Sequence, residues 1–184
     1  MAEAQRREKV AICGFSLTTL FEAPFCDEQF DIWGLNELYI HIPRFDRWFQ
    51  MHSQAEIEAS VRDQNHYRWL KECEKPIYML ARRSDIPSSV AYPLNSIIGV
   101  FGNYMTSTVA YMVALAIYEK YKEIHLYGVD MSLDAEYRYQ RPNVEYLLGF
   151  ARGMGIHVRI PNDSNLLKAS ELYGYGIPSL RYRF

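Results

Sequence analysis

The sequence predicts an α/β fold: a single Rossmann-like domain whose sheet is mostly parallel and carries helices on both faces. Short apolar segments, which predict strands, alternate with helical segments along the chain, and the connections between the strands are long enough to join parallel neighbours in a sheet. The 184 residues suffice for one domain. Hydrophobic residues make up 49% of them and charged residues 23%, so we expect one packed core.

The first half of the chain predicts short strands. The run KVAIC at Lys9–Cys13 is apolar and is ended by Gly14. Runs of similar length and character predict further strands at Asp31–Leu35, Arg47–Met51 and Pro76–Leu80. We expect Gln54–Cys73 to form one rather polar helix, and Pro87 and Pro93 to break the stretch that follows the fourth strand.

The second half predicts the main helix of the fold. Thr106–Tyr121 is Ala-rich and apolar almost all round, so we expect a helix buried against the sheet. A strand is expected next at Glu123–Val129, and a helix at Pro142–Met154 that Gly155 ends. The run HVRIP predicts a last strand at His157–Pro161, and a short helix is expected at Ser164–Ala169.

Composition and charge argue against several classes of protein. Lys and Arg number 20 against 22 Asp and Glu, so the net charge of −2 gives no cationic field for nucleic acid. No run approaches the roughly 18 apolar residues of a membrane span, and the start has no apolar core of a secretion signal. Cys13, Cys26 and Cys73 share no CxxC spacing, which disfavours disulfides and a zinc site. We therefore expect a cytoplasmic protein with no bound metal.

Ligands of open parallel sheets bind at the carboxyl ends of the strands, so the residues that follow each strand are the candidate site residues. After the first strand come Gly14 and Ser16, which suit either a phosphate or a capped strand–helix turn. Asn36 follows the second strand and suits a nucleobase edge or ribose, or an Asx-turn. His52 follows the third strand and is the histidine that we consider for catalysis, although a lone histidine is more often structural.

Hydroxyl side chains open the buried helix. Thr106, Ser107 and Thr108 stand at its amino end with no acidic residue in the first turn. The unpaired amides and the positive end of the dipole favour an anion there. Capping by a hydroxyl is the alternative, and the two are compatible.

The last two strands also end in polar residues. Asp130 follows Gly128 and suits a ribose hydroxyl, a metal or the role of a base, or else a simple turn. Arg138 and Arg141 lie in a polar, aromatic stretch that could close over a ligand and pair with phosphate, the alternative being a solvated pair of charges. The last strand is followed by Asn162 and Ser164, of which Ser164 could serve only as a helix cap.

The segment TSTVAYMVALAIYEKYKEIHLYGVDM, followed by tyrosines and by HVRIPNDSNLL, resembles bacterial sialyltransferases of the single-Rossmann-domain kind. The GVD strand end is also similar to the 6-hydroxymethylpterin diphosphokinase-like domain of motility-linked glycosyltransferases. The resemblance spans Lys9 to Leu167 and is firm from Thr106 onward. Compact chains of this type also occur among phage proteins, so it is consistent with a phage source. It implies a CMP-like nucleotide pocket lined by Gly14, Ser16, Asn36, Thr106, Ser107, Gly128, Asp130, Tyr137, Asn162 and Ser164.

One departure from that family concerns catalysis. The sialyltransferases carry their catalytic histidine in the lid that follows the strand-end aspartate, whereas this chain has no histidine between His125 and His157. The first functional hypothesis is therefore a transferase that uses a nucleotide-activated, sugar-like donor, with His52 or Asp130 as the base. The second is a nucleotide-derivative binding protein, or sponge, without turnover, and the third is an interaction module.

The C-terminal end predicts self-association. We expect a Rossmann-like nucleotide-binding domain over residues 1–171 and an aromatic tail over 172–184. Gly174, Gly176 and Pro178 prevent a regular helix in the tail, yet its tyrosines and leucines are too apolar to be left in water. The tail is expected either to fold back on its own domain or to dock on a neighbour, and we favour a homo-oligomer.

Overall fold

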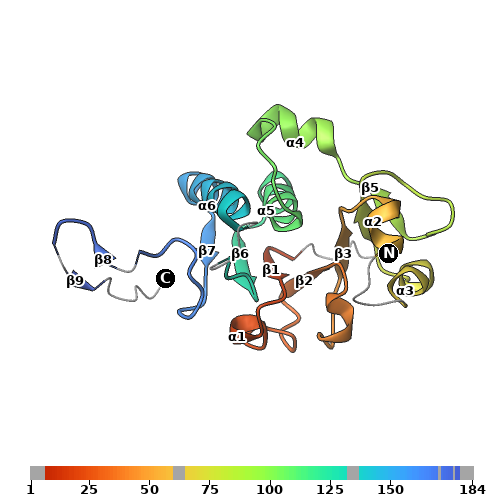
Figure 1. Cartoon of the computed structure of the whole chain (residues 1–184), viewed down its shortest axis with the longest axis horizontal. Coiled ribbons are helices and arrows are strands. Elements are labelled where there is room, and N and C mark those ends of the chain that lie inside the picture. The colour runs from red at the N-terminus through yellow and green to blue at the C-terminus, as the bar shows by residue number, and fades with distance from the viewer. Residues whose placement is uncertain (1–6, 60–64, 132–136, 170, 176, 179–184) are drawn as a thin grey trace.

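A computed structural model describes residues 7–59, 65–131, 137–169, 171–175 and 177–178. Its main feature is a seven-stranded sheet in the order β5-β4-β3-β2-β1-β6-β7, in which every neighbouring pair is parallel (Figure 1). The α/β class with a parallel sheet is thus confirmed. The strands are β1 (Lys9–Cys13), β2 (Phe30–Leu35), β3 (Arg47–Gln50), β4 (Ile77–Met79), β5 (Ser89–Ala91), β6 (Glu123–Tyr127) and β7 (His157–Arg159).

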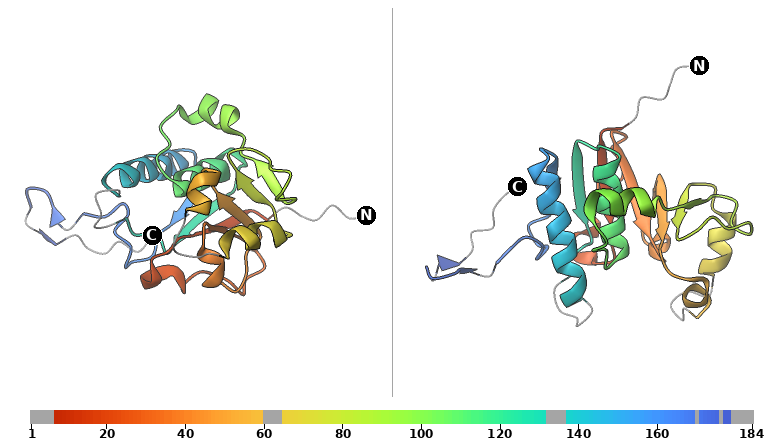
Figure 2. Two further views of the ribbon diagram at one scale, coloured as in Figure 1. Left: turned by 45° about the vertical axis from the view of Figure 1, so that its right-hand side comes forward. Right: turned by 90° about the horizontal axis from the view of Figure 1, so that it is seen from above.

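Helices cover both faces of the sheet, as expected (Figure 2). Alternate residues of β1 point to opposite faces, so Val10 and Ile12 pack beneath α4, α5 and α6, whereas Ala11 and Cys13 pack with α1, α2 and α3. The helices are α1 (Leu17–Leu20), α2 (Gln54–Glu58), α3 (His66–Glu72), α4 (Leu94–Phe101), α5 (Thr108–Tyr118) and α6 (Tyr137–Gly153), with the 3₁₀ turn η1 (Leu38–Ile40).

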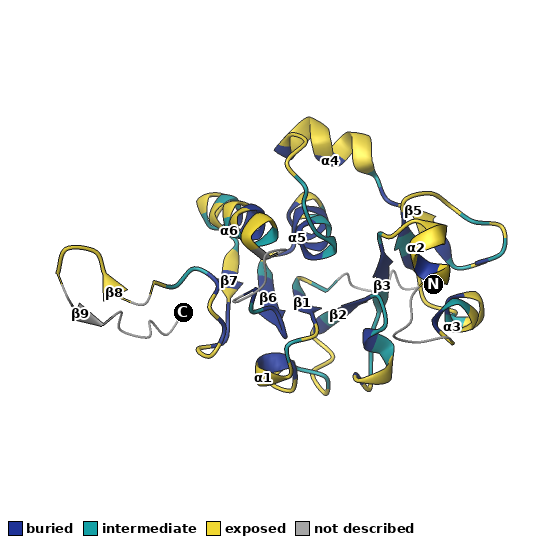
Figure 3. Ribbon diagram, in the orientation of Figure 1, coloured by how far each residue is buried: buried dark blue, intermediate teal, exposed yellow. Residues whose placement is uncertain are grey.

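Helix α5 is the centre of the larger core. Its residues from Ala110 to Ile117 are buried except for Tyr111, between the sheet on one side and α4 and α6 on the others (Figure 3). A sequence that is apolar almost all round suits this place, because only the side of the helix with Tyr111 and Tyr118 reaches solvent. The predicted buried helix is confirmed. No helix in the described part of the chain is both long and apolar enough to cross a membrane.

Two predicted helices are wrong in extent. Gln54–Cys73 is not one helix: α2 ends at Glu58 and α3 begins at His66, with residues 60–64 between them outside the described ranges. The helix predicted to begin at Pro142 begins at Tyr137 instead. Pro142 thus lies in the second turn of α6, where its fixed φ suits the helix but it has no N–H to donate to the carbonyl of Arg138.

The short helix predicted at Ser164–Ala169 does not form. The ammonium of Lys168 instead donates to the carbonyl oxygens of Pro161, Asn162 and Ser164, and Leu167 has a positive φ of 55°. Because these carbonyls are satisfied by a side chain, the loop needs no helical backbone bonds.

A strand and a helix were not predicted because prolines were expected only to interrupt. Strand β5 lies between Pro87 and Pro93, and α4 begins directly after Pro93. The prolines thus flank regular elements rather than break one, which is where proline is best tolerated.

The tail forms a small antiparallel hairpin of β8 (Glu171–Leu172) and β9 (Ile177–Pro178) that stands away from the sheet in Figures 1 and 2. Tyr173 is 99% exposed and Tyr175 78% exposed. These described tyrosines therefore do not fold back onto their own domain. Residues 179–184 lie outside the described ranges.

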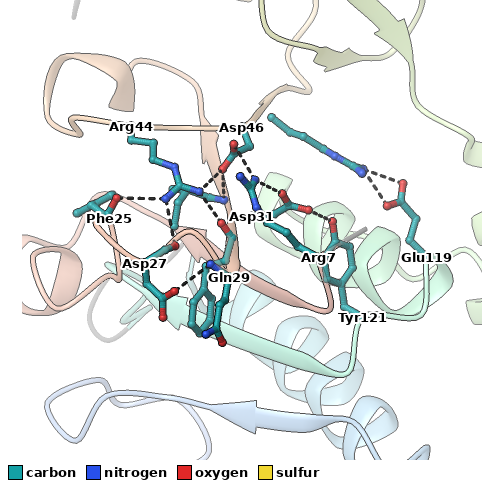
Figure 4. A network of polar contacts seen from close by, with 12 residues as sticks. Arg7, Phe25, Asp27, Gln29, Asp31, Arg44, Asp46, Glu119 and Tyr121 are labelled. Atoms are coloured by element: carbon teal, nitrogen blue, oxygen red, sulfur yellow. Dashed lines mark hydrogen bonds and ion pairs between the residues drawn. The ribbon is translucent and has the colours of Figure 1, made fainter. Parts of the chain in front are cut away.

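A network of ion pairs and hydrogen bonds lies at the amino ends of the strands β1, β2 and β3 (Figure 4). Asp46 accepts from the backbone N–H of Ile32 at 2.9 Å and from Arg44 at 3.0 Å, and it pairs with Arg7 at 2.9 Å. Arg7 also donates to Asp31, which accepts from the hydroxyl of Tyr121. Partial burial alone would raise the pKa of Asp46, but these donors outweigh it and lower the pKa below its usual value.

This network gives a pH-dependent component of stability. Because the pKa of Asp46 is lower in the folded state, its contribution is present above the unfolded pKa, near about 3.9, and is lost as the pH falls through the folded value. We expect Asp46→Asn to lower the free energy of unfolding at pH 7 by about 1–3 kcal/mol. Urea unfolding at pH 7 and at pH 3 measures this. The wild type should lose more stability between the two values than the variant, and equal losses would contradict the assignment.

Candidate functional site

A cleft of about 870 Å³ opens at the carboxyl ends of the strands, where the sheet order reverses between β1 and β6. This volume is in the range of small-molecule sites, and the position is the one that open parallel sheets use for ligands. The predicted residues that line it are Gly14, Ser16, Asn36, His52, Thr106, Ser107, Gly128 and Asp130.

Two glycines form the floor of the cleft where β1 and β6 end. Gly14 donates to the carbonyl of Tyr127 at 2.8 Å, and Ser16 donates to that of Gly128 at 2.8 Å. A Cβ on Gly128 would lie 2.2 Å from the carbonyl oxygen of Gly14, and its φ of 66° is in the left-handed region. Glycine is therefore required here by space as well as by conformation.

The amino end of α5 forms one wall. Ser107 is the N-cap and accepts from the amide of Ala110 at 3.2 Å, so capping is present as expected. By helix geometry the amides of Thr108 and Val109 have no partner within the helix. The cap and an anion site are therefore compatible, as the sequence predicts.

Thr106 is held by a buried residue of α6 that the sequence analysis missed. Its amide donates to Oδ1 of Asn143 at 3.0 Å, and the amide nitrogen of Asn143 donates to the carbonyl of Tyr104. Asn143 is fully buried. A signal for it was present, because Asn143 stands one helical turn before Leu147 on the apolar stripe of α6.

Two amide side chains that line the cleft, half-buried Asn36 and buried Gln50, carry buried oxygens without a hydrogen-bond donor. The backbone of Asn36 is fixed by the carbonyl of Phe49 and the indole of Trp48, each at 3.0 Å, and its Oδ1 has no partner among the described residues. Gln50 is 2% exposed, and its Oε1 likewise has none. Since a buried acceptor without a donor is costly, these oxygens are suited to hydroxyl or amino groups of a ligand.

His52 is exposed at the mouth of the cleft and is oriented by Gln50. The amide nitrogen of Gln50 lies 3.2 Å from Nδ1 of His52. An amide nitrogen can only donate, so in this arrangement Nδ1 accepts and the neutral ring carries its proton on Nε2. Close by, Ser53 and Glu56 form the capping box of α2, and the bonds from Ser53 lower the pKa of Glu56.

Asp130 lies at the opposite side of the cleft, two residues beyond Gly128. Its Oδ1 accepts from the backbone amide of Asn165 at 2.7 Å and from that residue's side chain at 3.0 Å. These bonds hold the carboxylate in place beside the loop that follows β7.

The described lining is acidic in formal charge. Glu37, Glu56 and Asp130 belong to it, and within the described ranges no Lys or Arg does. An anionic ligand would therefore be met by amides, hydroxyls and His52 only. At the end of β1, burial raises the pKa of Cys13 to about 12, so this thiol is no nucleophile at neutral pH.

Several predicted residues lie away from the described lining. Ser164 is buried and donates to the carbonyl of Val129 at 2.8 Å, and Asn162 is exposed on a turn. Arg141 pairs with Glu145 and donates to the carbonyl of Asn165 at 2.7 Å, so it ties α6 to the last loop.

The start of α6 holds the other predicted lid residues. Tyr137 is its first residue, and Arg138 is exposed in its first turn. Residues 132–136 of the predicted lid lie outside the described ranges. The lining residues Glu37, Gln50, Glu56, Tyr111 and Gln140 were not predicted, although Glu37 and Gln50 sit beside predicted strand-end residues.

No family model and no curated protein sequence matches this chain. Its fold is similar to that of solved sialyltransferases. CstII from Campylobacter jejuni, in complex with the substrate analogue CMP-3FNeuAc, has a TM-score of 0.56 at 17% identity, over 94% of this chain and 93% of that one. Cst-I, a monofunctional α-2,3-sialyltransferase from the same organism, has 0.54 at 15% over 89% and 79%. An α-2,3-sialyltransferase from C. jejuni in apo form has 0.52 at 16% over 97% and 82%. At these identities the similarity establishes the sialyltransferase-like fold.

Proposed function

We propose that the protein is a transferase that uses a nucleotide-activated, sugar-like donor with one phosphate, of the CMP-sugar type. The cleft at the β1–β6 reversal carries this proposal, because it joins an anion-binding helix start to buried amide oxygens. The fold shared with a sialyltransferase bound to a CMP-sugar analogue supports it. The pterin-kinase relation, the phage source, the cytoplasmic location and the homo-oligomer stay predictions.

The groups of the cleft can be given roles in this reaction. The amides that start α5 and the hydroxyl of Ser107 would bind the phosphate, and Asn36 would bind the base or ribose. Asp130 would take the proton of the acceptor hydroxyl, while Nε2–H of His52 would donate to the leaving phosphate. Electrostatics favour one phosphate over three, since three carboxylates line the cleft and no Lys or Arg of the described chain does.

We expect CMP to raise the melting temperature by about 5–10 °C at saturation, since a ligand that binds only the native state stabilises it by mass action. CTP should raise it less, because the acidic lining opposes additional phosphates. Thermal unfolding with each nucleotide up to millimolar concentration measures both effects. If no nucleotide or nucleotide sugar shifts the melting temperature, the proposal is wrong.

The second candidate is a nucleotide-derivative binding protein without turnover. The lack of any histidine between His125 and His157 favours it, because the resembled family carries its base there. Incubation of a CMP-sugar with acceptor sugars, followed by detection of released CMP, separates the two candidates. The transferase is supported if the wild type releases CMP and Asp130→Asn still binds the CMP-sugar but releases no CMP. The binding protein is supported if the wild type binds the CMP-sugar without releasing CMP.

A further inference from the structure

Three metal-ligating side chains lie together at the end of the sheet opposite the cleft. Glu123 begins β6, and the register pairs it with His157, which begins β7. His125 is two residues further along β6, so its side chain is on the same face as that of Glu123. One donor atom from each of the three lies within 4.8 Å of the other two.

The hydrogen bonds of His125 prepare it as a ligand. Its Nε2 lies 3.1 Å from Oε2 of Glu123, and its Nδ1 lies 3.3 Å from the hydroxyl of Tyr127. Around tetrahedral Zn²⁺ with bonds of about 2.0–2.2 Å, neighbouring donor atoms are about 3.3–3.6 Å apart, so a small outward shift of this pair would give the spacing of a metal site. Without a metal, the contact with Glu123 needs a proton on Nε2. In the other tautomer Nδ1–H donates to the Tyr127 hydroxyl and the lone pair on Nε2 can bind a metal that lies between it and Glu123, which is how outer contacts orient metal-bound histidines.

Burial gives the cluster a fixed side and an open side. His125 is 5% exposed and its ring packs against Phe30 with centroids 4.8 Å apart. His157 is exposed, which leaves a path for an ion and room for water as a fourth ligand. Both histidines stand on paired strands, and rigid elements hold ligand geometry better than loops do.

We propose that Glu123, His125 and His157 form a zinc-binding site. Two imidazoles and one carboxylate with an open position make a donor set suited to Zn²⁺, whereas Mg²⁺ and Ca²⁺ prefer oxygen ligands alone. The cysteine spacing gave no indication of it, since no thiol takes part. The site is separate from the cleft and does not depend on the proposed transferase function.

Nearby cations limit the affinity of the site. Lys9 lies 3.2 Å from Oε1 of Glu123, and Arg159 is on the same face of β7 as His157. Lys9 meets the carboxylate oxygen that does not face His125, so Oε2 remains directed at the cluster. Removal of the ammonium in Lys9→Met should therefore tighten zinc binding, because it removes both a competitor and a like charge.

Zinc titration of the full chain with Cys26→Ser and Cys73→Ser tests the site, because both thiols reach solvent and could bind zinc themselves. Calorimetry should show one Zn²⁺ per chain, and the melting temperature should rise by about 5–10 °C at about 100 times Kd. His157→Gln changes an exposed residue, so it should fold normally and weaken binding at least tenfold. His41→Gln, at another exposed histidine, and His52→Gln, in the cleft, should leave the zinc affinity unchanged.

Co²⁺ in place of Zn²⁺ reports the geometry by its visible absorption, which should be intense for a four-coordinate site and absent in His157→Gln. The proposal is overturned if the parent chain shows no saturable one-to-one binding. It is also overturned if His157→Gln binds zinc like the parent, or if His52→Gln rather than His157→Gln removes the binding.

Discussion

Gly128→Ala is expected to lower the melting temperature by about 4–20 °C. A side chain at its φ of 66° costs about 1–2 kcal/mol. The new Cβ would also overlap the backbone oxygen of Gly14 at 2.2 Å, and such overpacking costs about 1–3 kcal/mol more. For a domain of this size each kcal/mol shifts the melting temperature by about 2–4 °C. Thermal unfolding followed by circular dichroism measures the loss.

Gly155→Ala is the matched control. Gly155 follows α6 with a φ of 80°, and a Cβ there would meet no atom within 4 Å. This variant keeps the conformational cost and lacks the overlap, so its loss should be clearly smaller. Equal losses in the two variants would show that the overlap with Gly14 has no cost, which would contradict the close approach of the two backbones.

Ser107→Asp is expected to lower the affinity for CMP by about 10- to 100-fold while the melting temperature of the free protein holds. Aspartate caps helices as well as serine does, and a negative charge at the start of α5 is favourable by up to about 1 kcal/mol. The same charge repels a phosphate charge about 6–10 Å away by about 1.5–3 kcal/mol at an effective dielectric constant near 20. Calorimetric titration with CMP measures the affinity.

Ser107→Asn separates charge from shape in that experiment. It keeps a capping side chain of nearly the same size as aspartate but carries no charge. Its CMP affinity should fall much less than that of the aspartate variant, because it loses the serine hydroxyl but adds no negative charge. If both variants bind CMP as the wild type does, the phosphate lies elsewhere in the cleft.

The sequence predicts most of the sheet because its strands are short apolar runs ended by glycine or by polar residues. It predicts Gly14, Asn36, Ser107 and Asp130 at the cleft for the same reason, since these residues directly follow strands or start the buried helix. The apolar stripe of α6 indicated that Asn143 is buried, but its role could not be predicted because its partner Thr106 is 37 residues away in the sequence. The role of Gln50 could not be predicted because its burial depends on tertiary packing. Ser164 and Arg141 have the right chemistry, but tertiary contacts engage them in joining the last loop to the domain.

The order of the strands in the sheet determines when the cleft can form during folding. Strand β1 precedes the other strands of the sheet in the sequence, yet its partner β6 is synthesised only after β2 to β5 and their helices. Pairings between such distant segments form slowly, because the entropic cost of closing the long loop arises before the contacts that offset it have formed. We therefore expect the contact between Gly14 and Gly128 in the floor of the cleft to form late in folding. A nascent chain that stops before Glu123 holds the ends of β1 to β5 but lacks Gly128 and Asp130, and with them one side of the cleft.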